Sequence, residues 1–257
     1  MKEYREKSAK ELKCLRESGK HLRSVLAMVI AAVRPGVSTQ ELDSIAEREI
    51  RAVGGVPIFK GYGSEWGKPF PASLCTSLNQ EVVHGIPSEK RIIQEGDLVK
   101  LDIGLRFEGM VTDMARTIAV GSVSSEAQRL LQITRESLDC GIAKICAGAH
   151  LSDYARAVQA HAEKHGYAVV RDLVGHGVGH ELHEDPQVPN YFHVGIRDFV
   201  FTKGMVLALE PMINAGGLQV KIASDGWTFV TSDGKLSAHF EDTIIVTDEG
   251  TEIVTRD

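Results

Sequence analysis

The sequence predicts the same order of elements twice: two amphipathic helices followed by a series of short strands. Apolar residues at helical spacing, capping pairs, and Pro or Gly stops indicate the helices. Residues 56–121 and the stretch from Gly166 onward show the β-rich runs and turn residues of strands. The helices are expected from Ser8 to Pro35-Gly36, from Ser38 to Gly54-Gly55, from Ser125 (paired with Gln128) to about Cys146, and from about Leu151 to His165.

A loose internal similarity suggests two related halves. Residues 36–54 align with residues 148–166 at an offset of 112. Each stretch starts at a Gly and carries an acid, Glu41 or Asp153, in the first helical turn. We therefore expect two similar halves that face each other across a cleft.

Length and charge exclude several classes of protein. A chain of 257 residues, 43% of them hydrophobic, suits one domain over residues 1–257, with halves of about 1–121 and 122–257. The net charge of −6 gives no reason to expect a nucleic-acid or membrane partner. The longest apolar run, residues 25–33, is shorter than the roughly 20 residues that span a bilayer.

The N-terminus and the cysteines indicate a cytoplasmic protein. The first residues are charged and lack the apolar core of a secretory signal. The four cysteines show no paired metal spacing, and we expect free thiols in a reducing compartment. They are Cys14, Cys75, Cys140 and Cys146.

Two aspartates follow one another on a predicted β-hairpin. Asp102 lies in a strand pattern, Asp113 lies in the next, and the turn falls near Glu108-Gly109. Such a turn can place the two carboxylates opposite each other on one face, where they repel unless they share a proton or bind a cation. The alternative is a different register, with each Asp in a turn or facing solvent.

Three histidines and three acids gather in the Gly-rich stretch from Gly175 to Pro186. His183 follows His180 by three residues, whereas the His-Glu-x-x-His motif of a zincin helix requires a spacing of four. That motif is therefore absent. Glycines allow the backbone to approach a ligand closely, which favours a binding loop that includes His176. An exposed polar loop is the alternative.

Glu210 and Glu241 stand beside apolar strand patterns. A carboxylate buried there is costly unless it is paired, so each either faces water at a strand edge or is held by a cation. His84, in a Val-Val-His-Gly-Ile-Pro stretch, is by itself more typical of a structural histidine.

Taken together, these segments resemble the type I methionine aminopeptidases. The resemblance extends over nearly the whole chain and implies an α+β fold of the pita-bread type, with antiparallel sheets flanked by helices and a metal site in the cleft. The motifs that carry it are Pro35-Gly36-Val37-Ser38, Asn79-Gln80-Glu81-Val82-Val83-His84-Gly85-Ile86-Pro87, Asp102-Ile103-Gly104, Thr112-Asp113, Gly175-His176-Gly177-Val178-Gly179, His183-Glu184-Asp185-Pro186, Leu209-Glu210-Pro211-Met212 and Phe240-Glu241-Asp242-Thr243.

The resemblance also implies roles for individual residues. The metal ligands would be Asp102, Asp113, His176, Glu210 and Glu241, holding two divalent ions (Co, Mn, Fe or Zn) bridged by a hydroxide. His84 and His183 would handle substrate, with Glu210 as the proton carrier. The implied activity is removal of the N-terminal methionine from nascent chains, at the ribosome, when the second residue is small.

The methionine pocket would be formed by Phe70, Cys75, Leu182 and Trp227. An extra segment, residues 63–68, departs from the family pattern and leaves the role of Tyr62 open.

Two further departures are His180, where many relatives have Arg, and His239, where many have Gln.

We expect a monomer. The rival interpretations are a proline- or dipeptide-specific peptidase of the same fold and a binding protein that has lost activity.

Overall fold

The computed structural model describes residues 5–256, and its four long helices form two pairs. Ser8 and Ser38 cap the first pair through reciprocal hydrogen bonds with Glu11 and Glu41, as predicted. The helices are α1 (Ala9–Ala32), α2 (Thr39–Ala52), α3 (Ser125–Ile142) and α4 (Leu151–Lys164).

The third helix differs from its prediction at both ends. Its cap is Ser124 rather than Ser125, because the Ser124 side chain accepts a hydrogen bond from the Ala127 amide. The helix ends at Ile142, before the expected Cys146. The amide of Lys144 bonds to the Gly141 carbonyl three residues back, a tighter turn than an α-helix allows.

The strands form four sheets in which every described pairing is antiparallel. In the first half, β1 (Val56–Pro57), β2 (Leu74–Leu78) and β5 (Met110–Ala119) all pair with β4 (Leu98–Phe107). In the second half, the strand order is β15 (Thr251–Ile253), β14 (Asp242–Val246), β9 (Val206–Leu209), β7 (Gly175–Gly177) and β8 (Glu184–Val188).

Two smaller sheets complete the fold. One contains β13 (Ser237–His239), β10 (Met212–Asn214) and β6 (Ala168–Val169). The other contains β11 (Val220–Ile222), β12 (Phe229–Thr231) and β3 (Glu81–Val83), and so joins residues of both halves. A short 3₁₀ turn, η1 (Ser64–Trp66), lies in the loop between β1 and β2.

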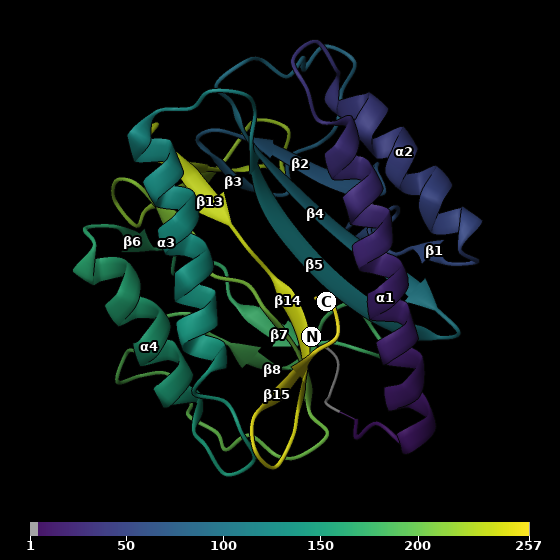
Figure 1. Ribbon diagram of the computed structural model, residues 1–257, viewed down its shortest axis with the longest axis vertical. Coiled ribbons are helices and arrows are strands. Elements are labelled where there is room, and N and C mark those ends of the chain that lie inside the picture. Colours follow the sequence, from purple (N-terminus) through teal and green to yellow (C-terminus); the bar gives the residue numbers. More distant parts are fainter. Residues whose placement is uncertain (1–4, 257) are drawn as a thin grey trace.

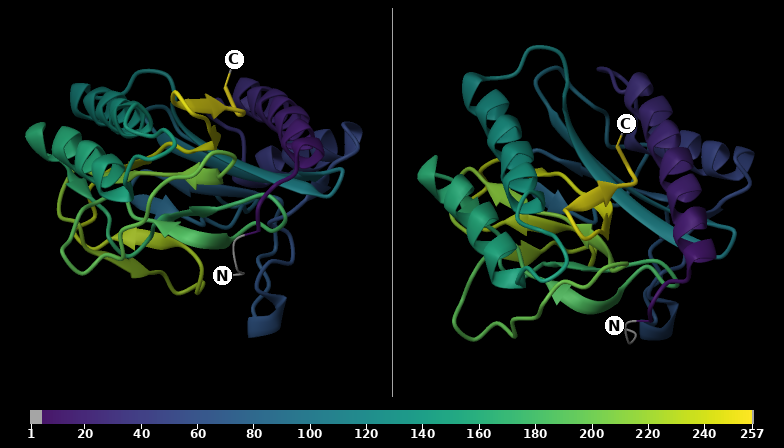
Figure 2. Two further views of the ribbon diagram at one scale, coloured as in Figure 1. Left: turned by 90° about the horizontal axis from the view of Figure 1, so that it is seen from below. Right: turned by 60° about the horizontal axis from the view of Figure 1, so that its bottom comes forward.

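The two aligned stretches begin and end in the same backbone conformation. Gly36, Gly54, Gly148 and Gly166, the ends of the two aligned stretches, adopt left-handed φ values of 90°, 79°, 92° and 85°. The pair α1–α2 flanks one side of the strands and α3–α4 flanks the other (Figure 1). The helices gather toward one side of the molecule, and the loop that contains η1 projects from the opposite side (Figure 2).

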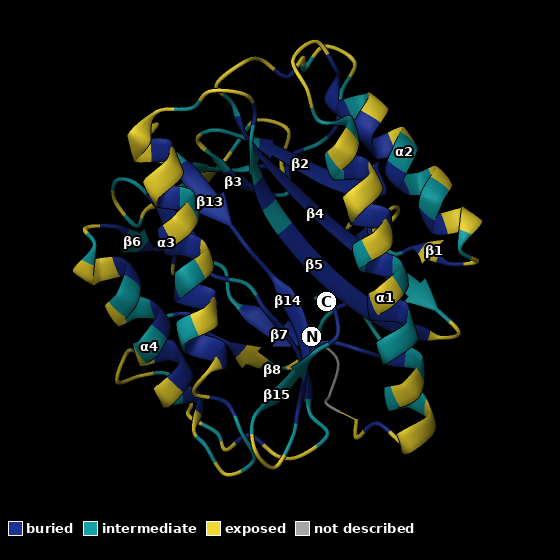
Figure 3. Ribbon diagram, viewed as in Figure 1, coloured by how far each residue is buried: buried dark blue, intermediate teal, exposed yellow. Residues whose placement is uncertain are grey.

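The core fills the space between the helices and the strands, and most residues of the central strands β4 and β5 are buried (Figure 3). Leu22, Leu26, Leu42 and Ile50 of the first helix pair pack against Leu101 and other apolar residues of β4. The second pair buries Leu138 and Tyr154 in the same way. This packing fixes the hairpin β4–β5 in the middle of the molecule, where its aspartates lie.

Candidate metal centre and substrate pocket

Asp102 on β4 and Asp113 on β5 lie on one face of the hairpin, but they are not directly opposite each other. The turn at Glu108-Gly109 pairs Phe107 with Met110, and this register places Asp102 opposite Ala115 and Gly104 opposite Asp113. The prediction that Asp102 and Asp113 face each other directly was therefore wrong, because they are diagonal neighbours across the two strands. Diagonal neighbours remain within reach of a shared ligand, and both aspartates are buried.

The other three predicted donors come from the second half. His176 lies on β7, Glu210 directly follows β9, and Glu241 directly precedes β14. The backbone of Glu241 exchanges two hydrogen bonds with Ala115 of β5, at 3.0 and 3.3 Å. This bridge joins the halves and brings Glu241 against the two aspartates.

Thr243 strengthens the same junction from β14. Its hydroxyl accepts a hydrogen bond from the amide of Asp113 and donates one to the carbonyl of the same residue, at 2.9 and 2.8 Å. The backbone that carries Asp113 is thereby held from both sides.

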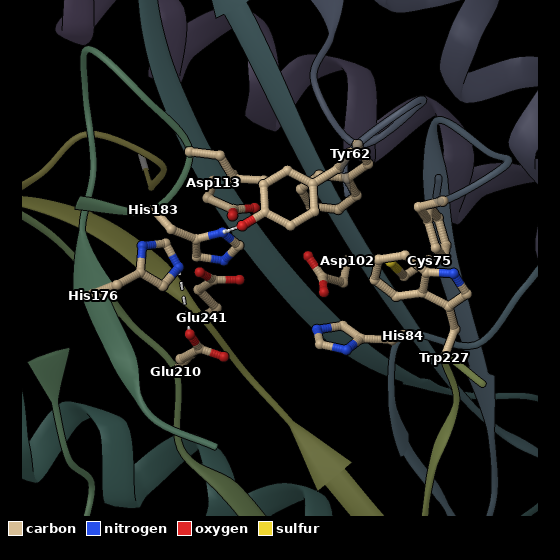
Figure 4. A pocket seen from close by; sticks show the side chains of 13 residues that line it. Tyr62, Cys75, His84, Asp102, Asp113, His176, His183, Glu210, Trp227 and Glu241 are labelled. Atoms are coloured by element: carbon tan, nitrogen blue, oxygen red, sulfur yellow. Dashed lines mark hydrogen bonds and ion pairs between the residues drawn. The ribbon is translucent and has the colours of Figure 1, made fainter. Parts of the chain in front are cut away.

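The five side chains line the same pocket, and Asp102 lies on the side nearer to His84 (Figure 4). Asp113, His176 and Glu241 each offer a donor atom, and these three atoms lie within 4.8 Å of one another. Nε2 of His176 is 3.5 Å from a carboxylate oxygen of Glu210. Among the described residues, Oδ1 of both Asp102 and Asp113 is buried without a hydrogen-bond partner. Unpartnered oxygens and an imidazole in one cluster fit a divalent cation.

The four carboxyl groups perturb one another strongly. Burial raises the pKa of Asp102 and of Glu210 to about 7. Burial, followed by repulsion from neighbouring carboxylates, raises the pKa of Asp113 and Glu241 well above the ordinary value. Four carboxylates enclosed together repel one another, so either some of them bind protons or a cation lies among them. The electrostatics of the pocket therefore also fit a metal centre.

His183 stands beside the cluster on the loop before β8. Its ring centroid is 4.3 Å from that of His176, and its Nδ1 is 2.6 Å from the hydroxyl of Tyr62 (Figure 4). Burial lowers the pKa of His183 to about 2, so the ring is neutral at physiological pH. The structure thus places Tyr62 in the site, although the extra segment after it had left its role open.

His84 lies across the pocket, after β3. Its backbone adopts a left-handed φ of 59°, uncommon for a residue other than glycine. Its ring makes edge contacts with Trp227 and Phe229, at centroid distances of 6.4 and 5.8 Å. Burial lowers its pKa to about 4, which leaves this imidazole neutral as well.

All predicted metal and substrate residues line one pocket. Phe59 lines it too and was missed by the sequence analysis. The Phe59 ring lies against Gly104 of β4. A Cβ atom at residue 104 would lie only 2.7 Å from that ring, so the glycine leaves the space that Phe59 occupies. The lining residues are Phe59, Tyr62, Phe70, Cys75, His84, Asp102, Asp113, His176, Leu182, His183, Glu210, Trp227 and Glu241.

The two histidines that depart from the family pattern occupy different surroundings. Nε2 of His239 is 3.6 Å from the second carboxylate oxygen of Glu210, so this ring flanks the candidate metal donors. His180 instead bonds to Glu11 near the start of α1, at 2.9 Å, and does not line the pocket.

The sequence profile of metallopeptidase family M24 matches residues 13–248. A methionine aminopeptidase of Clostridium acetobutylicum is 46% identical to the chain over 249 residues, which is 97% of each protein. The chain belongs to the methionine aminopeptidases of metallopeptidase family M24. The resemblance inferred from its motifs is therefore confirmed.

Solved structures confirm the expected fold of this family member. The methionine aminopeptidase of Thermotoga maritima superposes with a TM-score of 0.93 at 39% identity, covering 98% of this chain and 99% of that one. The Xaa-Pro dipeptidase of Bacillus anthracis also matches, with a TM-score of 0.77 at 26% identity, but the match covers only 62% of that longer chain. Within residues 5–256, no helix is long and apolar enough to cross a membrane.

Proposed function

We propose that this protein removes the N-terminal methionine from polypeptides by metal-dependent hydrolysis when the second residue is small. The observation that carries the proposal is the grouping of five candidate metal donors in a pocket whose remaining walls are mainly aromatic and apolar, with His84 and His183 among them (Figure 4). The close similarity to methionine aminopeptidases over 97% of the chain supports the same activity.

Asp102, Asp113, His176, Glu210 and Glu241 would hold two divalent ions, with Co, Mn, Fe and Zn all compatible with carboxylate and imidazole donors. When bound, such ions polarise a carbonyl group and lower the pKa of water toward neutrality. The unpartnered oxygens of Asp102 and Asp113 support this assignment.

Glu210 is the best-placed proton carrier. Its carboxylate oxygens lie 3.5 Å from His176 and 3.6 Å from His239, among the candidate metal donors, so this carboxylate is placed to exchange a proton with a water held there. In the proposed reaction it accepts a proton from the attacking water and delivers it to the leaving amine.

His183 would stabilise the developing charge on the scissile carbonyl oxygen. A Tyr62 hydroxyl that donates to Nδ1 leaves the proton of the neutral ring on Nε2, where it can be donated to substrate. His84, neutral and on the other side of the pocket, would hydrogen-bond near the scissile nitrogen.

The pocket walls would select methionine. Phe59, Phe70, Cys75 and Trp227 offer aromatic faces and sulfur, which suit an unbranched, polarizable thioether. Leucine would be a poor substrate rather than an excluded one, because small apolar differences discriminate by only about 1–3 kcal/mol.

The biological setting follows from this activity. We propose that the protein acts in the cytoplasm, as a monomer, on nascent N-termini at the ribosome. Neither nucleic acid nor a membrane is required as a partner.

The test begins with protein stripped by a chelator and reloaded with Mn, Co, Fe or Zn singly. We expect turnover of Met-Gly-Ser and Met-Ala-Ser only with metal, and little turnover of Met-Lys-Ser, formyl-Met-Gly-Ser or Ala-Pro-Ser. Cleavage of Ala-Pro-Ser in preference to Met-Ala-Ser would instead assign the protein to the proline-specific peptidases. Metal binding without any turnover would indicate a binding protein.

A further inference from the structure

The segment that departs from the family pattern, residues 63–68, forms a closed turn. Its base is fastened by two hydrogen bonds, from the Gly61 amide to the Phe70 carbonyl at 2.8 Å and from the Phe70 amide to the Tyr62 carbonyl at 2.7 Å. Gly63 and Gly67, at the two ends of η1, adopt left-handed φ values of 80° and 75°. The turn projects from the body of the molecule (Figure 2, the blue segment near the N label).

The turn presents Trp66 at the mouth of the substrate pocket. This side chain is 64% exposed, and its ring meets that of Tyr62 edge-on at a centroid distance of 5.5 Å. A side chain at Gly63 would lie 3.0 Å from Trp66 and 3.1 Å from Trp227, so the turn packs closely against the pocket wall. The indole is therefore held in place while most of its surface stays in water.

A groove of about 970 Å³ runs along this turn. Five of its lining residues also line the inner pocket: Tyr62, His84, Leu182, His183 and Trp227. We refer to this space as the outer groove. Because it shares walls with the pocket, the outer groove offers a path for the rest of a substrate whose first residue lies in the pocket.

We propose that the outer groove binds the part of the substrate that follows its second residue, and that Trp66 contacts an apolar side chain there. The inference rests on the proposed function and adds a second selective position to it. A single exposed tryptophan is ordinary on a protein surface; its place along the exit route of the substrate is what assigns it this role.

Distances favour contact at the third or fourth substrate residue. The Tyr62 ring lies 5.0 Å from the His183 ring and 5.5 Å from the Trp66 ring, and these two distances together set the greatest separation of His183 and Trp66. An extended peptide advances about 3.3 Å per residue, so two to three residues beyond the scissile bond reach the indole.

The charges around the outer groove favour an apolar occupant. Glu65 and Glu181 are acidic and Lys68 is basic, so the rim offers no single sign of charge to select a charged peptide. Trp66, Tyr62 and Phe229 supply aromatic surface instead. Covering such surface with an aliphatic side chain removes apolar area from water, which is favourable.

The test compares two substrates with the same cleavage site, Met-Ala-Leu-Leu and Met-Ala-Ser-Ser, in metal-loaded protein. We expect kcat/KM to favour the leucine peptide about five- to tenfold in the natural protein, as expected for partial burial of an aliphatic side chain. Trp66→Ala should reduce this ratio to about one- to twofold, and Trp66→Phe should retain most of it.

Val194→Ala is the matched control, because Val194 is 88% exposed and does not line the groove. It should leave the ratio unchanged. The inference fails if the natural protein shows no preference for the leucine peptide, or if the preference survives in Trp66→Ala. Failure to cleave either peptide would overturn the proposed function, and the inference with it, whereas equal cleavage of both would overturn the inference alone.

Discussion

The hydroxyl of Tyr62 lies 2.6 Å from Nδ1 of His183, although 121 residues separate the two in the chain. Tyr62 belongs to the first half and His183 to the second, so this hydrogen bond joins the two halves beside the candidate metal donors. It fixes the orientation of a neutral imidazole and determines which of its nitrogens faces the pocket.

Tyr62→Phe should fold, keep its metal, and lose turnover. Removing the hydroxyl frees the His183 ring to rotate, and loss of such an orienting partner typically lowers activity about 10- to 100-fold. Steady-state kinetics on Met-Ala-Ser, with metal content measured in parallel, checks this expectation. His183→Ala should lose at least as much, because it removes the group itself. A Tyr62→Phe protein that is metal-free would show that this hydrogen bond supports the metal centre instead.

Asp113→Asn and Glu241→Gln should each abolish most metal binding. Each change removes a charge from the three-residue group whose donor atoms lie within 4.8 Å. Isothermal titration with Mn would measure the loss directly. Asp248→Asn is the control, because that exposed carboxylate lies in a surface pair with Lys203. Unchanged Mn affinity in both site variants would contradict the ligand assignment.

The stabilisation of the protein by metal should grow with pH. Burial raises the pKa of Asp102 and Glu210 to about 7, from ordinary values of about 4. In metal-free protein these carboxyls therefore contribute stability below about pH 4, and this contribution is lost as pH rises through 7. Metal binding requires the deprotonated groups.

The gain in Tm on adding Mn should accordingly be larger at pH 8 than at pH 5. Differential scanning fluorimetry at the two pH values, with and without Mn, measures it. Equal gains would mean that these carboxyls do not compete with protons for the ion.

Lys7→Met should destabilise the fold. Nζ of Lys7 is 2.6 Å from a carboxylate oxygen of Glu184, and the two side chains are 0% and 2% exposed. The change leaves Glu184 buried without its cation, which typically costs about 3–5 kcal/mol. Glu184 also accepts hydrogen bonds from the amides of His180 and Glu181, so the loop that precedes His183 should loosen.

Urea denaturation of the metal-free protein measures this loss of stability. Adding Glu184→Gln to Lys7→Met should recover part of it, because the unpaired charge is gone. Lys203→Met, which breaks the exposed pair with Asp248, should change stability by less than about 1 kcal/mol. If Lys7→Met costs no more than this control, the buried pair does not hold the loop.

Local chemistry made the helices predictable. Ser8 and Ser38 each bond to a glutamate three residues later, and such contacts depend only on neighbouring residues. The same locality explains the one-residue error at the third helix, where Ser124 and Ser125 are both suitable caps and the backbone geometry selects the first.

The site was only partly predictable. The motifs predicted five metal donors through their resemblance to a family, and these residues line one pocket, but the residues alone gave a wrong partner for Asp102. The turn at Glu108-Gly109 contains only two residues, with φ values of 46° and 85°, and this short turn sets the register of the whole hairpin. Phe59 showed no signal, because its place depends on the space left at Gly104.

The sequence by itself determined the elements, their order, and the family to which the chain belongs. The tertiary structure decided which side chains meet: Tyr62 with His183, Lys7 with Glu184, and His239 with Glu210. The physical reason is the distance along the chain. Caps and turns are satisfied within a few residues, whereas these pairs form only when antiparallel sheets from two halves pack together, and no local pattern encodes that arrangement.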